Sequence, residues 1–275
     1  MARLTWDDTG NRIYETGTKQ GVLFPKQTTG NWYETGVAWN GLTAVSESPS
    51  GAEETALYAD DVKYLSLRSN EEFGATVEAY TYPDEWAECD GSASLAEGVY
   101  VGQQTRLGFG LAYVTTVGND QKGNDYGYKL HLIYNAMASP SEKSYATIND
   151  SPEAITFSWE LTTTPIKMPK VNGKQLKNSA TIIIDSTKLN PAKMSQIEDM
   201  VFGYDAYDEV TPDQGANPSS LGYYVQSNGT YVLTSDTSVQ DGTQYYVVSE
   251  DETKGAPTLP TPEQIFAIVA ATTEP

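Results

Sequence analysis

Residues 72–82 read Glu-Phe-Gly-Ala-Thr-Val-Glu-Ala-Tyr-Thr-Tyr, and the character of their side chains alternates along the stretch. Successive side chains of a β-strand point to opposite faces of the sheet, so this alternation predicts a half-buried strand. The face toward the core is expected to carry Phe73, Ala75, Val77, Ala79 and Thr81. The face toward water is expected to carry Glu72, Gly74, Thr76, Glu78 and Tyr80. One buried and one solvated face are typical of an antiparallel sheet.

Residues 154–164, Ala-Ile-Thr-Phe-Ser-Trp-Glu-Leu-Thr-Thr-Thr, repeat the same design. Their apolar face is expected to carry Ile155, Phe157, Trp159 and Leu161, and their polar face Thr156, Ser158, Glu160 and Thr162. Further strands are predicted at 106–117, 126–138 and 179–187, with a hairpin loop at 118–127. Because Tyr, Phe, Thr and Val favour strands, the chain is expected to be mainly β, with a β-sandwich as its largest part.

Other segments indicate arms, loops and a helix. The first 40 residues predict short strands and an extended N-terminal arm, and 46–63 predicts a long loop that contains Pro49-Ser50-Gly51. Residues 191–202 predict one flanking helix that Asn190 caps, with Pro191 in its first turn and Gly203 after its end. The buried stripe of this helix is expected to consist of Met194, Ile197, Met200 and Val201.

The composition changes after residue 203. An acidic linker at 204–220 precedes 221–249, where Asn228-Gly229 and Asp241-Gly242 separate short Tyr/Val runs and predict hairpins of a small β module. The end of the chain, Pro-Thr-Pro-Glu-Gln-Ile-Phe-Ala-Ile-Val-Ala, is compatible with a short helix. We therefore expect domains at 1–203 and 204–256, followed by a C-terminal segment, 257–275, that packs on the first domain or on a neighbouring subunit.

The charge balance is strongly acidic, with 17 Lys and Arg residues against 37 Asp and Glu residues, a formal net charge of −20. Since cationic side chains dominate affinity for phosphates, such a chain is expected to repel nucleic acid. A single cysteine excludes an internal disulfide. The N-terminus shows no signal-peptide pattern, and no apolar run is long enough to span a membrane, so we expect a soluble protein made in a cytoplasm.

Motifs for catalysis or cofactor binding are missing from the sequence. His131 is the only histidine and lies within a predicted strand, which favours a structural role. The Asn119, Asp120, Asn124 and Asp125 run lacks the spacing of an EF-hand and is interpreted as a hairpin loop rather than a calcium site. We expect no enzyme activity, no cofactor and no metal.

Residues 81–91, Thr-Tyr-Pro-Asp-Glu-Trp-Ala-Glu-Cys-Asp-Gly, place Asp84, Glu85, Glu88 and Asp90 beside Cys89. A pair of catalytic carboxylates needs different environments that separate their pKa values, and a short Pro/Gly-containing loop favours shared solvent. We interpret this stretch, the acidic corner, as the end of a strand in which Trp86 packs and Cys89 is buried or half-buried.

Several long strings resemble the major tail tube proteins of long, flexible-tailed (siphovirus-type) bacteriophages, in matching order over most of residues 1–202. They are GVAWNGLTAVSESPSGAEETALYADDVKYL (36–65), EEFGATVEAYTYPDEWAECDG (71–91), GQQTRLGFGLAYVT (102–115), DYGYKLHLIYNAMASP (125–140) and SPSEKSYATINDSPEAITFSWELTTTP (139–165). The C-terminal segment is similar to the proline-rich end of this group. The 204–256 region departs from the simpler family pattern and resembles small β modules that decorate the outside of some tails.

The resemblance implies a β-sandwich with a flanking helix that assembles into stacked hexameric rings, a hollow tube in the virion through which genomic DNA passes without specific binding. It implies a tape-measure protein, a tail terminator and a distal tail protein as partners, and no membrane. It also implies that an inter-strand loop ties subunits and rings together, here with Glu47, Glu53, Glu54, Asp60 and Asp61 as its acids.

Six chains of −20 total −120 formal charges, and part of this charge on the lumen wall would repel phosphates over a screening length of about 8–10 Å. Candidate lumen-facing acids are Glu72, Glu78 and Glu160; Asp84, Glu85, Glu88 and Asp90 are candidates for a ring rim or interface. Two alternatives stay open: a carbohydrate- or cell-surface-binding module of adhesin type, and, far behind it, a hydrolase based on the acidic corner.

Overall fold

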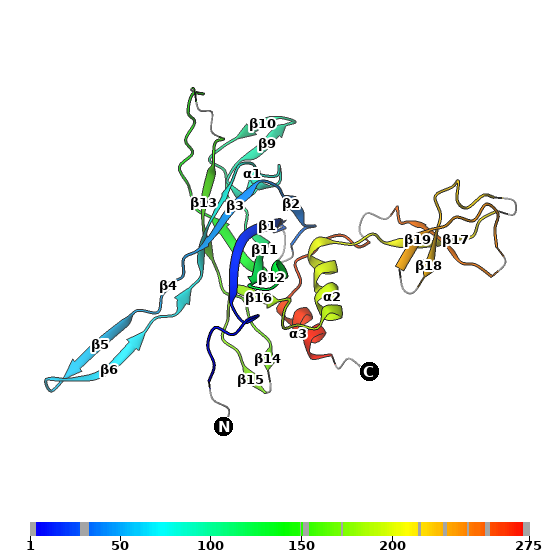
Figure 1. Cartoon of the computed structure of the whole chain (residues 1–275). Coiled ribbons are helices and arrows are strands. Elements are labelled where there is room, and N and C mark those ends of the chain that lie inside the picture. Colours follow the sequence, from blue (N-terminus) through cyan, green and yellow to red (C-terminus); the bar gives the residue numbers. More distant parts are fainter. Residues whose placement is uncertain are drawn as a thin grey trace. The chain divides into compact units, whose positions relative to one another are not determined.

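The computed structural model describes residues 4–27, 33–148, 150, 154–171, 173–213, 216–227, 230–240, 242–250 and 254–271 (Figure 1). The chain divides into two compact units, of which the main unit comprises Met1–Phe202 with Thr258–Pro275 and the small unit comprises Gly203–Pro257. The prediction of a mainly-β fold is confirmed, because a large antiparallel sheet dominates the main unit and a second, smaller sheet forms the small unit.

An eight-stranded sheet forms the main unit, in the order β2-β1-β11-β12-β13-β8-β3, with β16 paired to β12. Its strands are β1 (Ile13–Pro25), β2 (Val37–Trp39), β3 (Leu42–Glu47), β8 (Gly74–Ala79), β11 (Phe109–Asn119), β12 (Gly123–Ala138), β13 (Phe157–Thr163) and β16 (Thr181–Asp185). The prediction of short strands in the first 40 residues holds for β2, which has three residues, but not for β1, which is a single 13-residue strand. Gly17 and Gln20 adopt positive φ angles at the irregularities in the pairing of β1 with β11.

Strand β12 takes part in two layers of the sheet, and it is irregular at Asn135, between the two segments that pair with different strands. Residues 129–133 of β12 pair with β16, whereas residues 136–138 pair with β13. Between these segments Asn135 has a φ of 51°, and its backbone N–H donates to the Tyr33 hydroxyl at 2.8 Å instead of to a strand. A residue in this conformation bends the strand locally, as β-bulges do. The β13-β8-β3 part of the sheet therefore forms a layer distinct from β1-β11-β12-β16.

Two apolar cores result, one on each side of β11. Leu111 and Tyr113 point into an inner core with Trp39, Trp86 and Trp159. The intervening Ala112 and Val114 face a second core, which also contains residues of two helices. A strand buried on both faces is expected where a sheet is covered on each side.

The alternation predicted for the two long strands is confirmed within β8 and β13, but the first of these strands is shorter than predicted, and Thr81, which was expected on the core side, lies beyond β8 and is exposed. Val77 faces Trp159 across β8 and β13, and Ala75 faces Leu161, all four fully or almost fully buried. β13 begins at Phe157, two residues later than Ile155, which is exposed.

Two helices cover the second core: the predicted flanking helix and a helix in the C-terminal segment, for which the sequence is compatible with a short helix. Helix α2 (Pro191–Phe202) has the predicted bounds, the Asn190 side chain accepts a hydrogen bond from the Ala192 N–H at 2.9 Å, and Gly203 has a φ of +77°. Met194, Ile197 and Val201 of its predicted stripe are buried. Helix α3 (Pro262–Ala270) packs against α2, and a short helix α1 (Trp86–Cys89) lies in the acidic corner.

The prediction of a long loop at 46–63 is wrong, because this region begins a β-hairpin. Strands β5 (Glu54–Ala59) and β6 (Val62–Arg68) pair through a two-residue turn, and β4 (Ser50–Gly51) pairs with β7 (Glu71–Glu72) at the root. Asp60 and Asp61 both have positive φ, 48° and 62°, as a type I′ turn requires. We refer to residues 50–72 as the arm; it projects from the sheet in Figure 1.

Shorter hairpins complete the main unit: β9 (Ala93–Ala96) with β10 (Val99–Val101), and β14 (Lys170–Val171) with β15 (Lys174–Gln175). The predicted 118–127 hairpin connects β11 and β12 but needs fewer residues for its turn, because both strands extend into the predicted loop.

The small unit contains a four-stranded sheet in the order β17-β20-β18-β19. Its strands are β17 (Tyr207–Val210), β18 (Tyr224–Ser227), β19 (Thr230–Leu233) and β20 (Tyr245–Val248). Residues 228–229, the predicted Asn-Gly turn, lie outside the described residues, as does Asp241. The prediction of a hairpin at Asp241-Gly242 is wrong, because β20 pairs with β17 and β18 rather than with the preceding β19.

Candidate assembly surfaces

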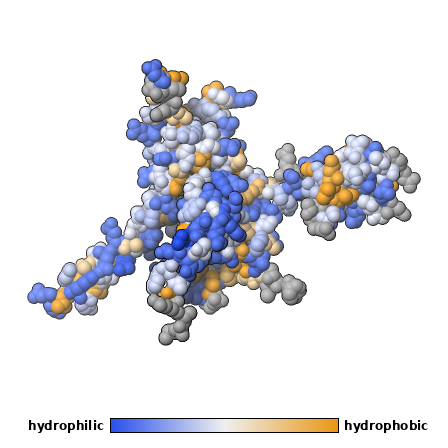
Figure 2. All heavy atoms as spheres, in the orientation of Figure 1, coloured by the Kyte–Doolittle hydropathy of each residue, from blue (hydrophilic) through white to orange (hydrophobic). Residues whose placement is uncertain are grey.

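The arm is amphipathic. Residues 55, 57 and 59 of β5 share one face, and their cross-strand partners are Leu67, Leu65 and Val62. This face is uncovered: the exposed fractions are 41% for Leu57, 38% for Leu65 and 55% for Leu67. Hydrophobic residues are visible toward the tip of the arm in Figure 2. Because a two-stranded ribbon has no core of its own, an apolar face of this kind indicates a surface that another chain covers.

The opposite face of the arm carries a polar network around Glu54. Lys63 Nζ and Ser66 Oγ donate to its Oε1, and Arg68 Nη2 lies 3.3 Å from its Oε2. The hydrogen bond from Lys63, followed by those from Ser66 and Arg68, lowers the pKa of Glu54 below its ordinary value. Glu53, Asp60 and Asp61 of the same candidate set are exposed, the last two in the turn.

Glu47, the remaining candidate acid of this set, does not lie in the arm. It ends β3, and its Oε1 accepts a hydrogen bond from the Tyr113 hydroxyl at 2.8 Å. His131 stacks on the Tyr113 ring at a centroid distance of 4.6 Å, with its Nδ1 3.5 Å from Glu47 and its Nε2 2.9 Å from Thr115 Oγ1. Burial lowers the pKa of His131 below its ordinary value, partly offset by Glu47. Glu47 therefore connects the root of the arm to the inner core.

In the acidic corner the structure separates one carboxylate from the others. Asp90 is half-buried, with a side chain only 8% exposed, and it pairs with Arg106 at 3.1 Å and with Lys143. Asp84, Glu85 and Glu88 are exposed. Trp86 and Cys89 are fully buried, as predicted, and burial raises the pKa of the Cys89 thiol to about 12, which disfavours the nucleophilic thiolate.

Two of the three candidate lumen acids share a sheet face. Glu78 lies opposite Ser158 and Glu160 lies opposite Thr76, so both carboxylates point away from the inner core. Glu160 is exposed and Glu78 half-buried. Glu72 does not lie in the same sheet: it belongs to β7 and pairs with Ser50 at the root of the arm. Glu78 and Glu160 therefore lie among small side chains on one face of the sheet, whereas Glu72 lies near the arm.

The candidate calcium residues hold the β11–β12 turn against the N-terminal segment. The Asn119 side chain donates to the Gly10 carbonyl and accepts from the Gln121 and Lys122 N–H groups. Asp120 accepts from the Gly10 N–H at 2.9 Å, and Asn124 accepts from the Tyr14 hydroxyl. These contacts give most of the run a structural role. Among the residues described, no three Asp, Glu, His or Cys side chains gather as a metal site would require.

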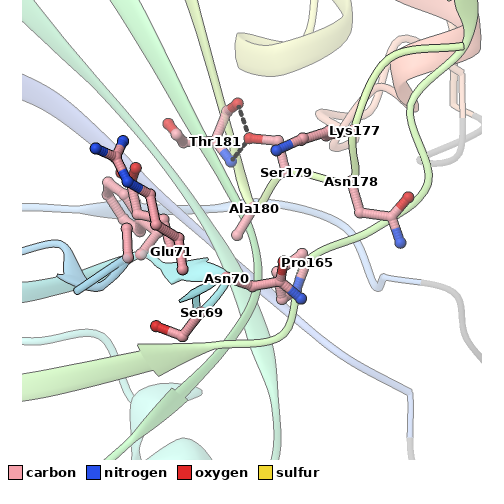
Figure 3. A pocket seen from close by; sticks show the side chains of 12 residues that line it. Ser69, Asn70, Glu71, Pro165, Lys177, Asn178, Ser179, Ala180 and Thr181 are labelled. Carbon is pink, nitrogen blue, oxygen red and sulfur yellow. Dashed lines mark hydrogen bonds between the residues drawn. The ribbon is translucent and has the colours of Figure 1, made fainter. Parts of the chain in front are cut away.

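A cavity of about 820 Å³ lies between the root of the arm on one side and Pro165 and Lys177 to Thr181 on the other. Figure 3 shows Ser69, Asn70 and Glu71 on one side and Lys177 to Thr181 on the other. The Thr181 hydroxyl oxygen is buried there and forms no hydrogen bond with the part of the chain that the structure describes. Its lining is mixed and partly charged, unlike the predominantly apolar lining of typical small-molecule sites.

Apolar side chains are also exposed outside the arm. Leu4 and Trp6 protrude from the N-terminal segment, and Leu95, Tyr100 and Val101 protrude from the β9–β10 hairpin. Sequence reasoning missed the apolar face of the arm, although Leu65 and Leu67 alternate with Ser66 and Arg68. Asp60-Asp61 is a weaker hairpin signal than Asn-Gly, and the acidic composition around it favoured a loop.

No family model matches the chain, and no curated protein matches it. Among solved structures, a chain of the sheath–tube complex of an extracellular contractile injection system, in its extended state, matches at 11% identity over 60% of this chain and 88% of that chain, with a TM-score of 0.25. This similarity is too low to establish a shared fold. None of the described helices has the length and apolar character needed to cross a membrane.

Proposed function

We propose that this chain is a structural subunit that self-assembles into stacked hexameric rings and so forms the tail tube of a long, flexible-tailed bacteriophage. Support comes from the sequence resemblance over most of residues 1–202 and from the mainly-β main unit. On this proposal the protein is made in the cytoplasm of the host and ends in the virion, where a tape-measure protein, a tail terminator and a distal tail protein contact the tube. It has no enzymatic activity of its own.

The observation that carries the proposal is the uncovered apolar face of the arm. Leu57, Leu65 and Leu67 would each gain roughly 1–2 kcal/mol if a partner removed their exposed parts from water. The arm also offers unpaired strand edges, which are templates for pairing with another chain. If the partner is a second copy of the chain, every subunit of the assembly gains this burial free energy. The cavity at the root of the arm is a candidate receptor for a segment of that copy.

The charge of the chain supports a conduit for DNA. In a ring of six, the face that carries Glu78 and Glu160 would present 12 carboxylates among small polar side chains. Placed on the lumen wall, this face would repel phosphates without offering cations that bind them. Glu72, at the root of the arm, is better placed for a contact between subunits than for the same wall.

The experiment replaces Leu57 and Leu65 by Lys in the same chain. Two charges on the apolar face should prevent its burial against a partner, whereas the fold should persist because neither side chain belongs to a core. We expect wild-type protein to sediment as rings or tubes, and the double variant to sediment as a monomer with an unchanged thermal unfolding midpoint.

Tyr58→Lys is the matched control, because Tyr58 is 71% exposed on the opposite face of β5. The control should assemble like the wild type. Equal assembly of the double variant and the wild type would refute the role of the arm.

A further inference from the structure

Four tyrosines occupy one face of the small unit's sheet. Tyr207, Tyr224, Tyr231 and Tyr246 come from the four different strands of that sheet. Cross-strand pairing places them on the same side, since Tyr224 lies opposite Tyr246, Gln226 lies opposite Tyr231, and residues two apart share a face. The Tyr207 and Tyr231 rings stack at 4.1 Å, and Tyr224 and Tyr246 contact this pair edge-on at 5.0 and 4.9 Å. We call this surface the tyrosine face.

The tyrosine face is not the core of the small unit. Among the described residues of the small unit, the fully buried ring is that of Tyr245, on the opposite side of the sheet, where its hydroxyl donates to Asp236 at 2.9 Å. The four face tyrosines are only half-buried, and Leu233 and Val248 beside them are exposed. The hydroxyls of Tyr207, Tyr224 and Tyr231 form no hydrogen bond within the described part of the chain, so they are available to a ligand.

A cavity of about 520 Å³ opens beside this cluster. Tyr204, Tyr207 and Tyr231 supply its aromatic walls, and Asp205 supplies an acceptor. Lys254 also lines the cavity, and its ammonium group pairs with Asp208. Ligand sites typically enclose about 300–1,000 Å³ and combine apolar walls with a few polar groups that fix orientation. The cavity matches this description in size and in chemistry.

The charge of the small unit restricts the class of ligand. Residues 203–257 contain nine acidic residues and one lysine, a net charge of −8. Nucleic acids and anionic polymers would be repelled, although both bind aromatic surfaces in proteins that provide cations. A neutral ligand with flat apolar faces and a rim of hydroxyl groups fits best, because tyrosine combines an apolar ring with a polar tip.

We propose that the tyrosine face and its cavity bind neutral carbohydrate. The C–H faces of pyranose rings would pack on Tyr207 and Tyr231, while sugar hydroxyls would hydrogen-bond to the phenol groups of the tyrosine face and to Asp205. The site lies wholly within the small unit and is therefore independent of the tube that the main unit is proposed to form.

The test is a titration of the full-length protein with chitohexaose, cellohexaose and maltohexaose, each up to about 10 mM, followed by isothermal calorimetry and saturation-transfer NMR. We expect at least one of them to bind. Tyr231→Ala should weaken that binding by a factor of about ten or more, and Asp205→Asn should weaken it about threefold. Asp205 is exposed, so its substitution preserves the fold even if Tyr231→Ala disturbs the sheet. Tyr145→Ala is the control, because Tyr145 is 72% exposed in the main unit.

Three results would overturn the proposal. One is that none of the three sugars binds. A second is binding that neither variant weakens. The third is a self-association of the chain that Tyr231→Ala abolishes while no sugar competes with it, which would make the tyrosine face a protein interface. If the protein binds sugar but forms no rings, the carbohydrate site is supported and the proposed tube is refuted. If it forms rings but binds no sugar, the tube is supported and the carbohydrate site is refuted.

Discussion

Asp90 differs from the other carboxylates of the acidic corner because it pairs with two cations. Its neighbours Asp84, Glu85 and Glu88 face solvent, whereas its own carboxylate lies between Arg106 and Lys143. Replacing Asp90 by Asn leaves two partly buried cations without their counterion, so the free energy of unfolding should fall by roughly 2 kcal/mol. Urea denaturation of unassembled protein measures this change. Glu85→Gln is the control and should stay within about 0.5 kcal/mol of wild type; equal losses in the two variants would contradict this account.

The burial of His131 leads us to expect that the stability of the folded protein depends on pH. Burial lowers its pKa in the folded state below the ordinary 6.5, while Glu47 and Glu15 raise it and Lys129 lowers it. The unfolded chain therefore binds more protons, and the free energy of unfolding should fall as the pH drops below about 6.5 toward the folded pKa. His131 is the only histidine, so His131→Gln should flatten the curve between about pH 6.5 and 5. Urea denaturation across this range tests it, and an unchanged slope in the variant would contradict it.

Much of this residue-scale picture was predictable from the sequence. The burial of Trp86 and Cys89 followed from the alternating strand before them and from the turn residues around them. The partners of Asp90 were not predictable, since Arg106 and Lys143 lie 16 and 53 positions away and only the fold brings them together. The same holds for the contact between Glu47 and Tyr113, which are 66 positions apart.

At the scale of elements, α3 is held by local and distant contacts. Thr261 Oγ1 accepts from the Gln264 N–H at 3.2 Å, and the Gln264 side chain accepts from the Thr261 N–H at 2.8 Å, a complete capping box. The Tyr134 hydroxyl also donates to the Pro260 carbonyl at 2.8 Å. The helix therefore begins at a fixed position over the second core.

Thr261→Ala removes the side-chain cap and should lower the free energy of unfolding of the main unit by about 1 kcal/mol. Chemical denaturation followed by circular dichroism measures the loss. Ser195→Ala, on the exposed side of α2, is the control, and no loss is expected there because alanine favours helix. A Thr261→Ala variant as stable as the wild type would show that α3 does not depend on its cap.

Elements with strong local signals were predicted well. Helix α2 has the predicted bounds because Asn190, Pro191 and Gly203 mark its ends and its apolar spacing marks its face. The arm and β1 were not predicted, for different reasons. The Asp60-Asp61 turn carries no glycine, and Gly17 within β1 suggested a break where the strand only shifts register. The second flanking helix was recognisable in the sequence as a short helical segment, but its packing against α2 was not.

At the scale of the whole molecule, the proposed tube rests on three features of the main unit. The arm supplies a surface that needs a partner, the face with Glu78 and Glu160 supplies negative charge, and the two-layer sheet supplies a rigid support. The small unit is an insertion with its own sheet and its own aromatic surface, so its role is separable from assembly.

Negative-stain electron microscopy of the purified, concentrated full-length protein tests the central claim most directly. The account predicts six-fold rings in end view and hollow tubes of stacked rings in side view. Single subunits at every concentration, or closed assemblies without a central channel, would contradict it.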